Sequence, residues 1–218
     1  MTHNDEAVIL LHGLARNASS MNKLERALTE WGYKVVNVDY PSTKHDIESL
    51  AELSIGNAID DVGPHSKIHF VTHSMGGILV RQFLRRHKMP SLGRVVMMGP
   101  PNSGSEIVDL LQNVPGFKTV NGPAGLQLSA KKDALPNQLG PADFELGIIA
   151  GSRSVNLVLS TMLPMPNDGK VSVESSKLAG MADHIIMPVT HTFMMRNPAV
   201  IKQVIVFLQF GKFKSVES

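Results

Sequence analysis

The sequence predicts an α/β fold, in which a mainly parallel sheet of about six strands carries helices on both faces. Two observations support this prediction. Short runs rich in β-branched residues alternate with segments of helical periodicity, which is typical of repeated strand–helix–strand units. A helical segment also follows the third run almost without a loop, as in a parallel sheet covered on both faces. The predicted strands are residues 7–11, 34–38, 67–72, 94–98, 146–150 and 183–189.

A crossover helix is predicted between the first two strands. Apolar residues recur there at helical spacing, at Met21, Leu24, Leu28 and Trp31. Ser19 and Ser20 precede this pattern, and we expect them to cap the helix. Gly32 follows it at the point where the helix is expected to end.

Three further helices are predicted along the chain. Apolar spacing indicates one within 47–62, before the third strand, and another over 78–86, directly after that strand. The last helix is expected to begin at Asn197 and Pro198, because asparagine suits the N-cap and proline suits the first helical position. Its apolar pattern continues to Leu208 and closes the fold.

Two stretches interrupt this regular alternation. Residues 102–143 contain several prolines around short apolar turns, and residues 152–166 have no periodicity. Neither stretch is long enough for a second domain, and no repeat of 20–50 residues is present. We therefore expect a single domain over residues 1–218, with 102–143 as a small insertion that forms a partial cap.

Composition and charge exclude several classes of function. The 218 residues are 43% hydrophobic and 18% charged, which is close to the globular averages of about 45–50% and 25%. The net charge is +2 and no long run of like charges occurs, so no nucleic acid partner is expected. Because the chain has no cysteine, disulfides, thiolate metal sites and a cysteine nucleophile are excluded.

The sequence shows no signal for export or membrane insertion. The apolar run at 7–11 is too short for a signal peptide and lacks a basic lead-in. No stretch approaches the roughly 20 apolar residues of a spanning helix, so we expect no transmembrane segment. The expected location is cytoplasmic, or else the chain is a mature form already trimmed of a leader. The sequence indicates no oligomeric state.

The strongest chemical signal is a serine at a strand-to-helix turn. The predicted strand 67–72 runs into the His-Ser-Met-Gly-Gly motif at 73–77 and then directly into a helix. Such a tight turn, called a nucleophile elbow, exposes the hydroxyl above the sheet and needs small residues two positions away on each side. Gly76 meets this need, whereas Thr72 replaces the usual first glycine. Ser74 is thus a candidate nucleophile; an N-cap serine on an ordinary turn is the alternative.

A serine nucleophile needs a base, and the base needs an acid to orient it. Asp168 follows the fifth predicted strand and His191 follows the sixth, which gives the order Ser, Asp, His found in α/β hydrolases. The intervening lengths allow all three side chains to reach the same edge of the sheet. The sequence therefore predicts a catalytic triad of Ser74, Asp168 and His191.

Each partner of Ser74 also has an alternative reading. Asp168 lies in an Asn-Asp-Gly sequence, which is a turn signal by itself. His191 is one of nine histidines, and His184 is its main rival as the base. We favour His191, because His184 lies at the start of a strand, at the opposite end from a site built on the carboxyl edge.

The negative oxygen that develops during acyl transfer must meet preset backbone donors. A His-Gly pair follows the first strand without a gap and places a loop at the same edge of the sheet. The N–H groups of Leu14 and Met75 are the expected oxyanion hole. An ordinary strand-to-helix turn is the alternative reading of this loop.

Together these motifs resemble the α/β-hydrolase superfamily, and in particular its compact bacterial esterases and triacylglycerol-lipase-like enzymes. The resemblance lies in an apolar strand followed by His-Gly, a His-Ser-Met-Gly-Gly elbow, an Asp-Gly-x-Val turn and a final histidine, and it covers nearly the whole chain. It implies an α/β-hydrolase fold with Ser74 as nucleophile, Asp168 as acid, His191 as base, and Leu14 and Met75 as oxyanion donors.

The resemblance implies a serine hydrolase that cleaves carboxylic esters through an acyl-enzyme intermediate. It requires no cofactor, and although larger lipases of this fold carry structural calcium, this sequence has no acidic cluster to support a metal site. Acyl transfer and thioester or amide cleavage would use the same triad and stay open as alternatives. A non-catalytic binding or scaffold protein is the remaining alternative.

The expected partner is a small acyl ester with an apolar acyl group. The insertion at 102–143 is expected to give an apolar underside to the pocket through Leu110, Leu111, Val114, Phe117, Leu126 and Leu128. Flexible thioethers near the predicted site in sequence would suit acyl chains of different shape, and core packing, the more common role of methionine, is the alternative. The five residues are Met75, Met162, Met165, Met194 and Met195.

Overall fold

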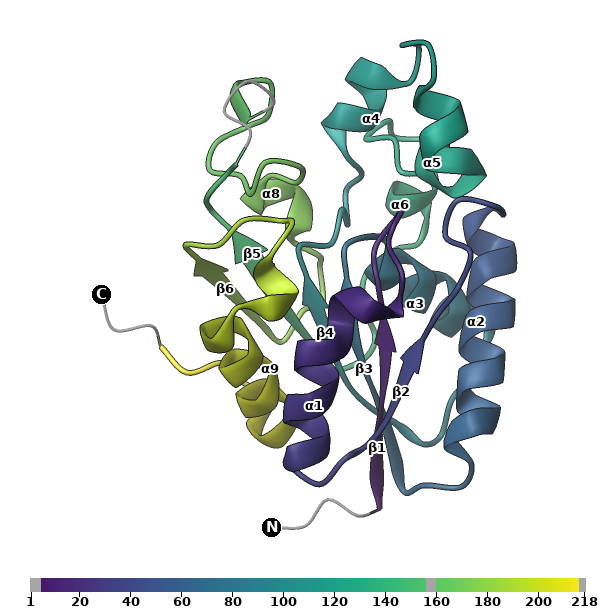
Figure 1. Cartoon of the computed structure of the whole chain (residues 1–218), viewed down its shortest axis with the longest axis vertical. Helices are drawn as coiled ribbons and strands as arrows, with labels where there is room; N and C mark the ends of the chain where they lie inside the picture. Colours follow the sequence, from purple (N-terminus) through teal and green to yellow (C-terminus); the bar gives the residue numbers. More distant parts are fainter. Residues whose placement is uncertain (1–4, 156–159, 216–218) are drawn as a thin grey trace.

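The computed structural model, which describes residues 5–155 and 160–215, contains a sheet of six parallel strands in the order β2-β1-β3-β4-β5-β6 (Figure 1). The α/β prediction is therefore confirmed, and the strand ends differ from the predicted ones by at most two residues. The strands are β1 (Glu6–Leu11), β2 (Lys34–Val38), β3 (Lys67–His73), β4 (Leu92–Met98), β5 (Leu146–Gly151) and β6 (Asp183–Met187).

Helices cover both faces of this sheet, because its central strands are apolar on both sides. In β1, Ile9 packs into the core formed with α2 and α3, and Leu10 packs into the core formed with α1 and α9. No helix of the described ranges is long and apolar enough to cross a membrane. The covering helices are α1 (Asn22–Glu30), α2 (Ile47–Val62), α3 (Met75–Arg86) and α9 (Pro198–Phe210).

The predicted helix ends are partly correct. Asn197 caps α9 as predicted, since its Oδ1 accepts a hydrogen bond from the N–H of Ala199 at 2.9 Å. The prediction that Ser19 and Ser20 cap α1 is wrong, because both lie inside the short 3₁₀ helix η1 (Ala18–Met21) that precedes it. Their hydroxyls donate to Asn17 instead, so the chain uses them to close the 3₁₀ turn.

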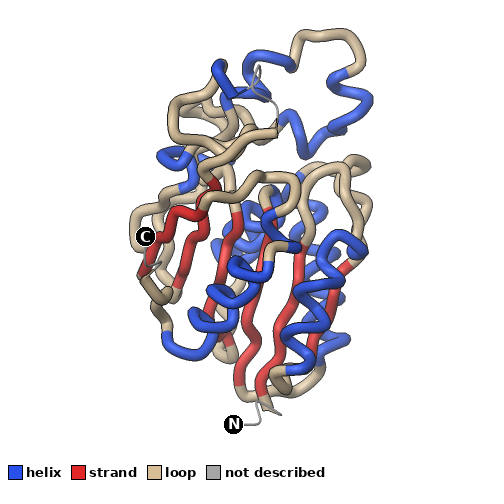
Figure 2. Tube along the Cα trace, turned by 60° about the vertical axis from the view of Figure 1, so that its left-hand side comes forward, coloured by secondary structure: helices blue, strands red, loops and turns tan. Residues whose placement is uncertain are grey.

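The predicted insertion 102–143 is compact and contains three short helices. They are α4 (Glu106–Leu111), α5 (Phe117–Leu126) and α6 (Leu135–Gln138). Figures 1 and 2 show α4 and α5 beyond the carboxyl ends of the strands, where a partial cap is expected. The second stretch, 152–166, leads into the short helix α8 (Val173–Ser176); its residues 156–159 lie outside the described residues.

A buried arginine of α3 holds the two ends of this insertion against the sheet layer. Arg81 is 5% exposed, and its guanidinium donates to the backbone oxygens of Asn102, Pro136 and Gly140, each at 2.9 Å. Burial lowers the pKa of Arg81 to about 10. Carbonyl oxygens thus replace water around this cation, and they fix where the insertion leaves and rejoins the fold.

Candidate active site

The site is built at the point where the strand order reverses. The chain leaves β1 for the edge strand β2 and then returns to β3 on the other side of β1. Ligands of open α/β sheets bind at such points, beyond the carboxyl ends of the strands. The loop after β1 carries Leu14, and the turn after β3 carries Ser74, so two of the predicted site residues meet here.

Ser74 occupies a strained turn between β3 and α3. Its backbone has φ 53° and ψ −123°, a conformation that non-glycine residues rarely adopt. The turn is held on both sides, because the Ser74 N–H donates to Met98 O at 2.9 Å and the Gly77 N–H donates to Ser74 O at 3.0 Å. Gly76 is required by packing, since a Cβ there would lie 2.7 Å from the backbone oxygen of Leu11.

Thr72 fits the position where the elbow pattern has its first glycine. It lies in β3 opposite Leu11 of β1 and Met97 of β4, and its side chain is fully buried. Its Oγ1 has no hydrogen-bond partner among the described residues. The turn therefore tolerates a β-branched residue, at the cost of an unsatisfied buried hydroxyl.

The structure brings the three predicted triad side chains together. His191 Nε2 lies 3.0 Å from Ser74 Oγ, and His191 Nδ1 lies 2.7 Å from Asp168 Oδ2. Asp168 is 2% exposed and His191 is 4% exposed, whereas Ser74 is partly accessible. Because the Asp168 carboxylate accepts from Nδ1, it favours the tautomer in which Nε2 is free to accept the serine proton.

The Asn-Asp-Gly turn signal and the predicted role of Asp168 as the acid are compatible. Asp168 Oδ1 accepts hydrogen bonds from the N–H groups of Lys170 at 3.0 Å and Val171 at 2.8 Å. The buried Asn167 accepts from the Gly169 N–H at 3.0 Å and fixes the turn from the other side. One Asp168 oxygen thus holds the turn, which leaves the other to face His191.

The predicted oxyanion donors lie on the two loops that meet at this edge. Met75 is the first residue of α3, and the first N–H groups of a helix have no partner within the helix. In the described parts of the chain, no protein acceptor engages the Leu14 N–H. Both residues flank Ser74, since Leu14 lines the same pocket and Met75 follows Ser74 in the chain.

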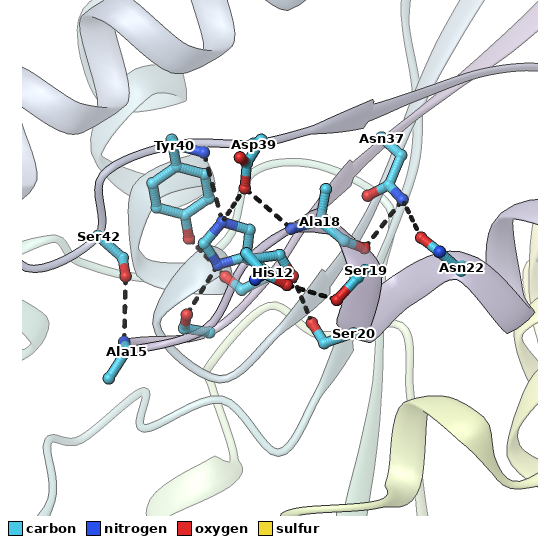
Figure 3. A network of polar contacts seen from close by, with 12 residues as sticks. His12, Ala15, Ala18, Ser19, Ser20, Asn22, Asn37, Asp39, Tyr40 and Ser42 are labelled. Atoms are coloured by element: carbon cyan, nitrogen blue, oxygen red, sulfur yellow. Dashed lines mark hydrogen bonds and ion pairs between the residues drawn. The ribbon is translucent and has the colours of Figure 1, made fainter.

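A buried network that sequence reasoning did not identify holds the Leu14 loop in place (Figure 3). The His12 ring stacks on Tyr40 at a centroid distance of 4.0 Å, and the Tyr40 hydroxyl donates to the backbone oxygen of His12. Ala15 has φ 53°, and its N–H donates to Ser42 Oγ at 3.0 Å. His12 is therefore a support for the loop. Only its place in the His-Gly pair signalled this part of the site.

Three other histidines that the structure describes, His184, His69 and His87, are engaged away from Ser74. His184 lies at the start of β6 and contacts Ser176 through Nε2 at 3.2 Å. His69 lies within β3, and His87 at the end of α3 pairs with Glu52 at 2.8 Å. His184 lies near the amino end of β6, at the opposite end of the sheet from the triad. This position agrees with the choice of His191 over His184 as the base.

A pocket of about 330 Å³ opens in front of Ser74 and extends below the insertion. Three of the six apolar residues expected on its wall line it: Leu111, Phe117 and Leu128. The expectation is wrong for Leu110, Val114 and Leu126, which do not line it; Leu110 follows Asp109 on α4 and is 52% exposed because successive helical residues point in different directions.

The pocket role considered for the methionines is also wrong, whereas the alternative of core packing holds for three of them. None of the five lines the pocket in front of Ser74. Met75, Met194 and Met195 are fully buried in the two cores beside the sheet, whereas Met162 is 52% and Met165 is 71% exposed. Nearness in sequence to the triad does not place a flexible side chain in the pocket. Met75, Met194 and Met195 fill the core instead.

The fold and this arrangement of serine, histidine and aspartate are those of an α/β hydrolase. The model of the family described as "Alpha/beta hydrolase family" matches residues 8–198, so the chain belongs to this family. A protein of Mycobacterium phage D29, named as a candidate non-heme haloperoxidase, is 28% identical over 88 residues. That match spans 37% of this chain and 31% of the phage protein.

Solved structures of similar fold include several lipolytic enzymes. The mature lipase BlEst2 of Bacillus licheniformis superposes with a TM-score of 0.73 at 18% identity, over 95% of this chain and 92% of that one. The phospholipase PlaB of Legionella pneumophila gives 0.74 at 17%, over 95% and 60%. The metagenomic carboxyl esterase MGS0156 gives 0.71 at 17%, over 88% and 65%. At these identities the likeness concerns the fold.

Proposed function

We propose that this protein is a serine hydrolase that cleaves carboxylic esters with an apolar acyl group. The observation that carries the proposal is the chain of contacts from Ser74 Oγ through both ring nitrogens of His191 to Asp168, at 3.0 and 2.7 Å. The strained elbow and the adjoining pocket with an apolar wall support it. The similar structures named as lipase, phospholipase and carboxyl esterase favour the same reaction class.

In the proposed mechanism, Ser74 Oγ attacks the ester carbonyl while His191 Nε2 takes its proton. The N–H groups of Leu14 and Met75 stabilise the negative oxygen of the tetrahedral intermediate. When the intermediate collapses, the alcohol leaves with the proton from Nε2 and the acyl group stays on Ser74. A water that gives a proton to His191 then attacks the acyl-enzyme, which releases the acid and the free Ser74 hydroxyl. Throughout, Asp168 stabilises the protonated ring of His191.

The mechanism is tested with a series of chromogenic acyl esters of increasing chain length. Ser74→Ala is expected to lower kcat by at least about 10⁴-fold with an unchanged unfolding transition. Retained turnover in the variant would contradict the assignment. The chain length that gives the highest kcat/KM measures the depth of the acyl pocket, and thioester and amide analogues with the same acyl group test the alternative leaving groups.

Two matched pairs of variants test the other triad members. Asp168→Asn is expected to cost about 10³–10⁴-fold in kcat, whereas Asp183→Asn, on an aspartate of β6 away from the site, is expected to retain activity. His191→Ala is expected to resemble Ser74→Ala, and His184→Ala to resemble the wild type. The reverse ranking in either pair would move the acid or the base to another residue.

A further inference from the structure

Two cationic side chains line the pocket in front of Ser74. Arg16 follows Leu14 in the loop after β1, and Lys170 follows Asp168 in the acid turn. Both line the same pocket as His191, and the apolar part of its wall includes Leu111, Phe117 and Leu128 of the insertion. An enzyme for wholly apolar esters has no need of two charges in this position.

Neither cation has a carboxylate partner among the described residues. The Arg16 Nη2 donates only to the backbone oxygen of Thr192, at 3.3 Å, and the Lys170 ammonium makes no hydrogen bond or ion pair there. Asp168 is the acidic side chain beside them, and both of its oxygens are already engaged, by His191 and by the N–H groups of the turn. Elsewhere the same chain pairs such cations, as in Arg94 with Glu145 at 2.9 Å.

The two cations also repel one another. Desolvation, together with the nearby Arg16 guanidinium, lowers the pKa of Lys170; desolvation, together with Arg196, lowers the pKa of Arg16. Like charges held near each other destabilise the empty site, and a bound anion would relieve that repulsion. The charge arrangement therefore favours a ligand with a negative group between Arg16 and Lys170.

The position of these cations relative to His191 indicates which part of a substrate they meet. In acyl transfer the leaving alcohol takes its proton from His191 Nε2, so the alcohol lies on the histidine side of Ser74. Arg16 binds the residue directly after His191, and Lys170 lies in the turn that holds the partner of His191. The acyl chain is left with the apolar wall formed by residues that include Leu111, Phe117 and Leu128.

We propose that Arg16 and Lys170 bind an anionic group, phosphate or carboxylate, on the alcohol side of the ester that Ser74 cleaves. This inference rests on the proposed ester hydrolase function and narrows its substrate class to acyl esters of anionic alcohols. Arginine binds either group in a planar two-point contact, and lysine adds a second point charge.

Two pairs of esters with one acyl chain test this assignment. The phosphate pair is 1-octanoylglycerol 3-phosphate and 1-octanoylglycerol; the carboxylate pair is the octanoyl ester of 4-hydroxybenzoate and that of 4-hydroxybenzamide. The wild type is expected to cleave the anionic member of at least one pair with about tenfold higher kcat/KM. The pair with the larger ratio identifies which anion the site prefers. Added salt is expected to reduce that ratio, because it screens partly exposed charges.

Variants separate charge recognition from structural support. Arg16→Gln and Lys170→Gln are each expected to lower kcat/KM for the preferred anionic ester about five- to tenfold, and to leave the neutral ester within about twofold. Lys132→Gln, on an exposed lysine of the insertion outside the pocket, is the matched control and is expected to change neither. Because the Lys170 ammonium makes no hydrogen bond or ion pair among the described residues, Lys170→Gln is expected to fold normally even if Arg16→Gln loosens the loop that carries Thr192.

Three results would overturn the inference. Equal turnover of both members in both pairs, with full dependence on Ser74, would refute anion recognition and leave the proposed hydrolase function intact. Equal losses on neutral and anionic esters in both variants would reduce Arg16 and Lys170 to structural supports. No turnover of any ester would refute the proposed function and the inference together.

Discussion

His73 lies beside His191, and its Nε2–H donates a hydrogen bond to the backbone oxygen of His191 at 3.0 Å. The rings are 4.8 Å apart at their centroids, and His73 is 1% exposed. His73, which precedes the proposed nucleophile, therefore fixes the loop that carries the proposed base. Its Nδ1 faces Gly13, where a Cβ would lie 2.8 Å away. The same ring therefore packs against the loop that carries Leu14 and leaves no room for a side chain at Gly13.

This contact makes His73 a positioning residue. His73→Leu leaves the buried carbonyl of His191 without a donor, which is expected to lower the free energy of unfolding by about 1–3 kcal/mol. It is also expected to lower kcat more than it changes KM, because the base loses its fixed position. His73→Gln restores a donor and is expected to recover part of kcat. If the two variants behave alike in kcat and KM, His73 only fills space.

Buried histidines give the fold a predictable dependence on pH. Burial is the main cause that lowers the pKa of His12, His69, His73 and His184. Below about pH 6.5 the unfolded chain binds protons that these groups do not bind in the folded state. Their stabilising effect is therefore complete above that pH and is lost as the pH falls.

Urea unfolding at pH 7.5 and 5.5 measures this effect. For His73, which is fully buried, the loss approaches about 1.4 kcal/mol per pH unit below 6.5. His73→Gln is expected to reduce the fall in stability between the two pH values, because it removes the buried group that takes up a proton on unfolding. Equal pH dependence in the wild type and His73→Gln would contradict the account.

Gly99 leaves room for the contact between Asp168 and His191. It follows β4 with φ 56°, and a Cβ there would lie 3.0 Å from Asp168 Oδ2 and 3.1 Å from His191 Nδ1. Gly99→Ala is expected to displace this pair and to lower kcat by about 10- to 100-fold. Gly63→Ala is the control, since Gly63 also has positive φ but nothing within 4 Å of its Cβ position. It is expected to lower stability alone; an equal loss of kcat in both would refute the role of Gly99.

Replacing Thr72, whose buried hydroxyl is unsatisfied among the described residues, is expected to stabilise the fold. Thr72→Val keeps the branched shape at this fully buried position and removes the Oγ1 that has no partner in the described ranges. The free energy of unfolding is expected to rise by about 1 kcal/mol, with kcat unchanged. Thr72→Ser keeps the hydroxyl and loses the methyl group, so it is expected to destabilise. A loss of stability in Thr72→Val, measured by urea unfolding, would show that the hydroxyl is bonded.

The contacts of Arg81 are expected to determine how firmly the insertion 102–143 is held against the sheet layer. Arg81→Met keeps the length of the side chain but leaves the carbonyls of Asn102, Pro136 and Gly140 without their donors. We expect a loss of about 3 kcal/mol in the free energy of unfolding and faster hydrogen exchange within 102–143. Arg85→Met, on an arginine with one exposed contact to Gln138, is the control. Unchanged exchange in Arg81→Met would contradict this role.

The sequence predicted what local periodicity and motif spacing determine. The central strands β1, β3, β4 and β5 are short apolar runs, so their positions follow from burial on both faces. Ser74, Asp168 and His191 follow strand ends in one sheet, and parallel strands bring such positions to a single edge. These features depend on the order of elements and on few long-range details.

The remaining features depend on packing between distant segments. Ser19 and Ser20 carry a cap signal, but Asn17 competes for their hydroxyls. The role of Ser42 follows from its contact with Ala15, which joins the loops after β1 and β2. No sequence motif marks Ser42. No motif in the sequence marks Arg16 or Lys170 as a site residue. Only the folded loops place them on one pocket.

The role of Ser74 as nucleophile is tested by identifying the residue that reacts with a fluorophosphonate while ester turnover is followed. We expect one adduct, located on Ser74 by peptide mass spectrometry, with turnover lost in proportion to labelling. Ser74→Ala is expected to give neither adduct nor turnover. An adduct on another residue, or ester cleavage that continues in the fully labelled protein, would contradict the claim that Ser74 is the nucleophile.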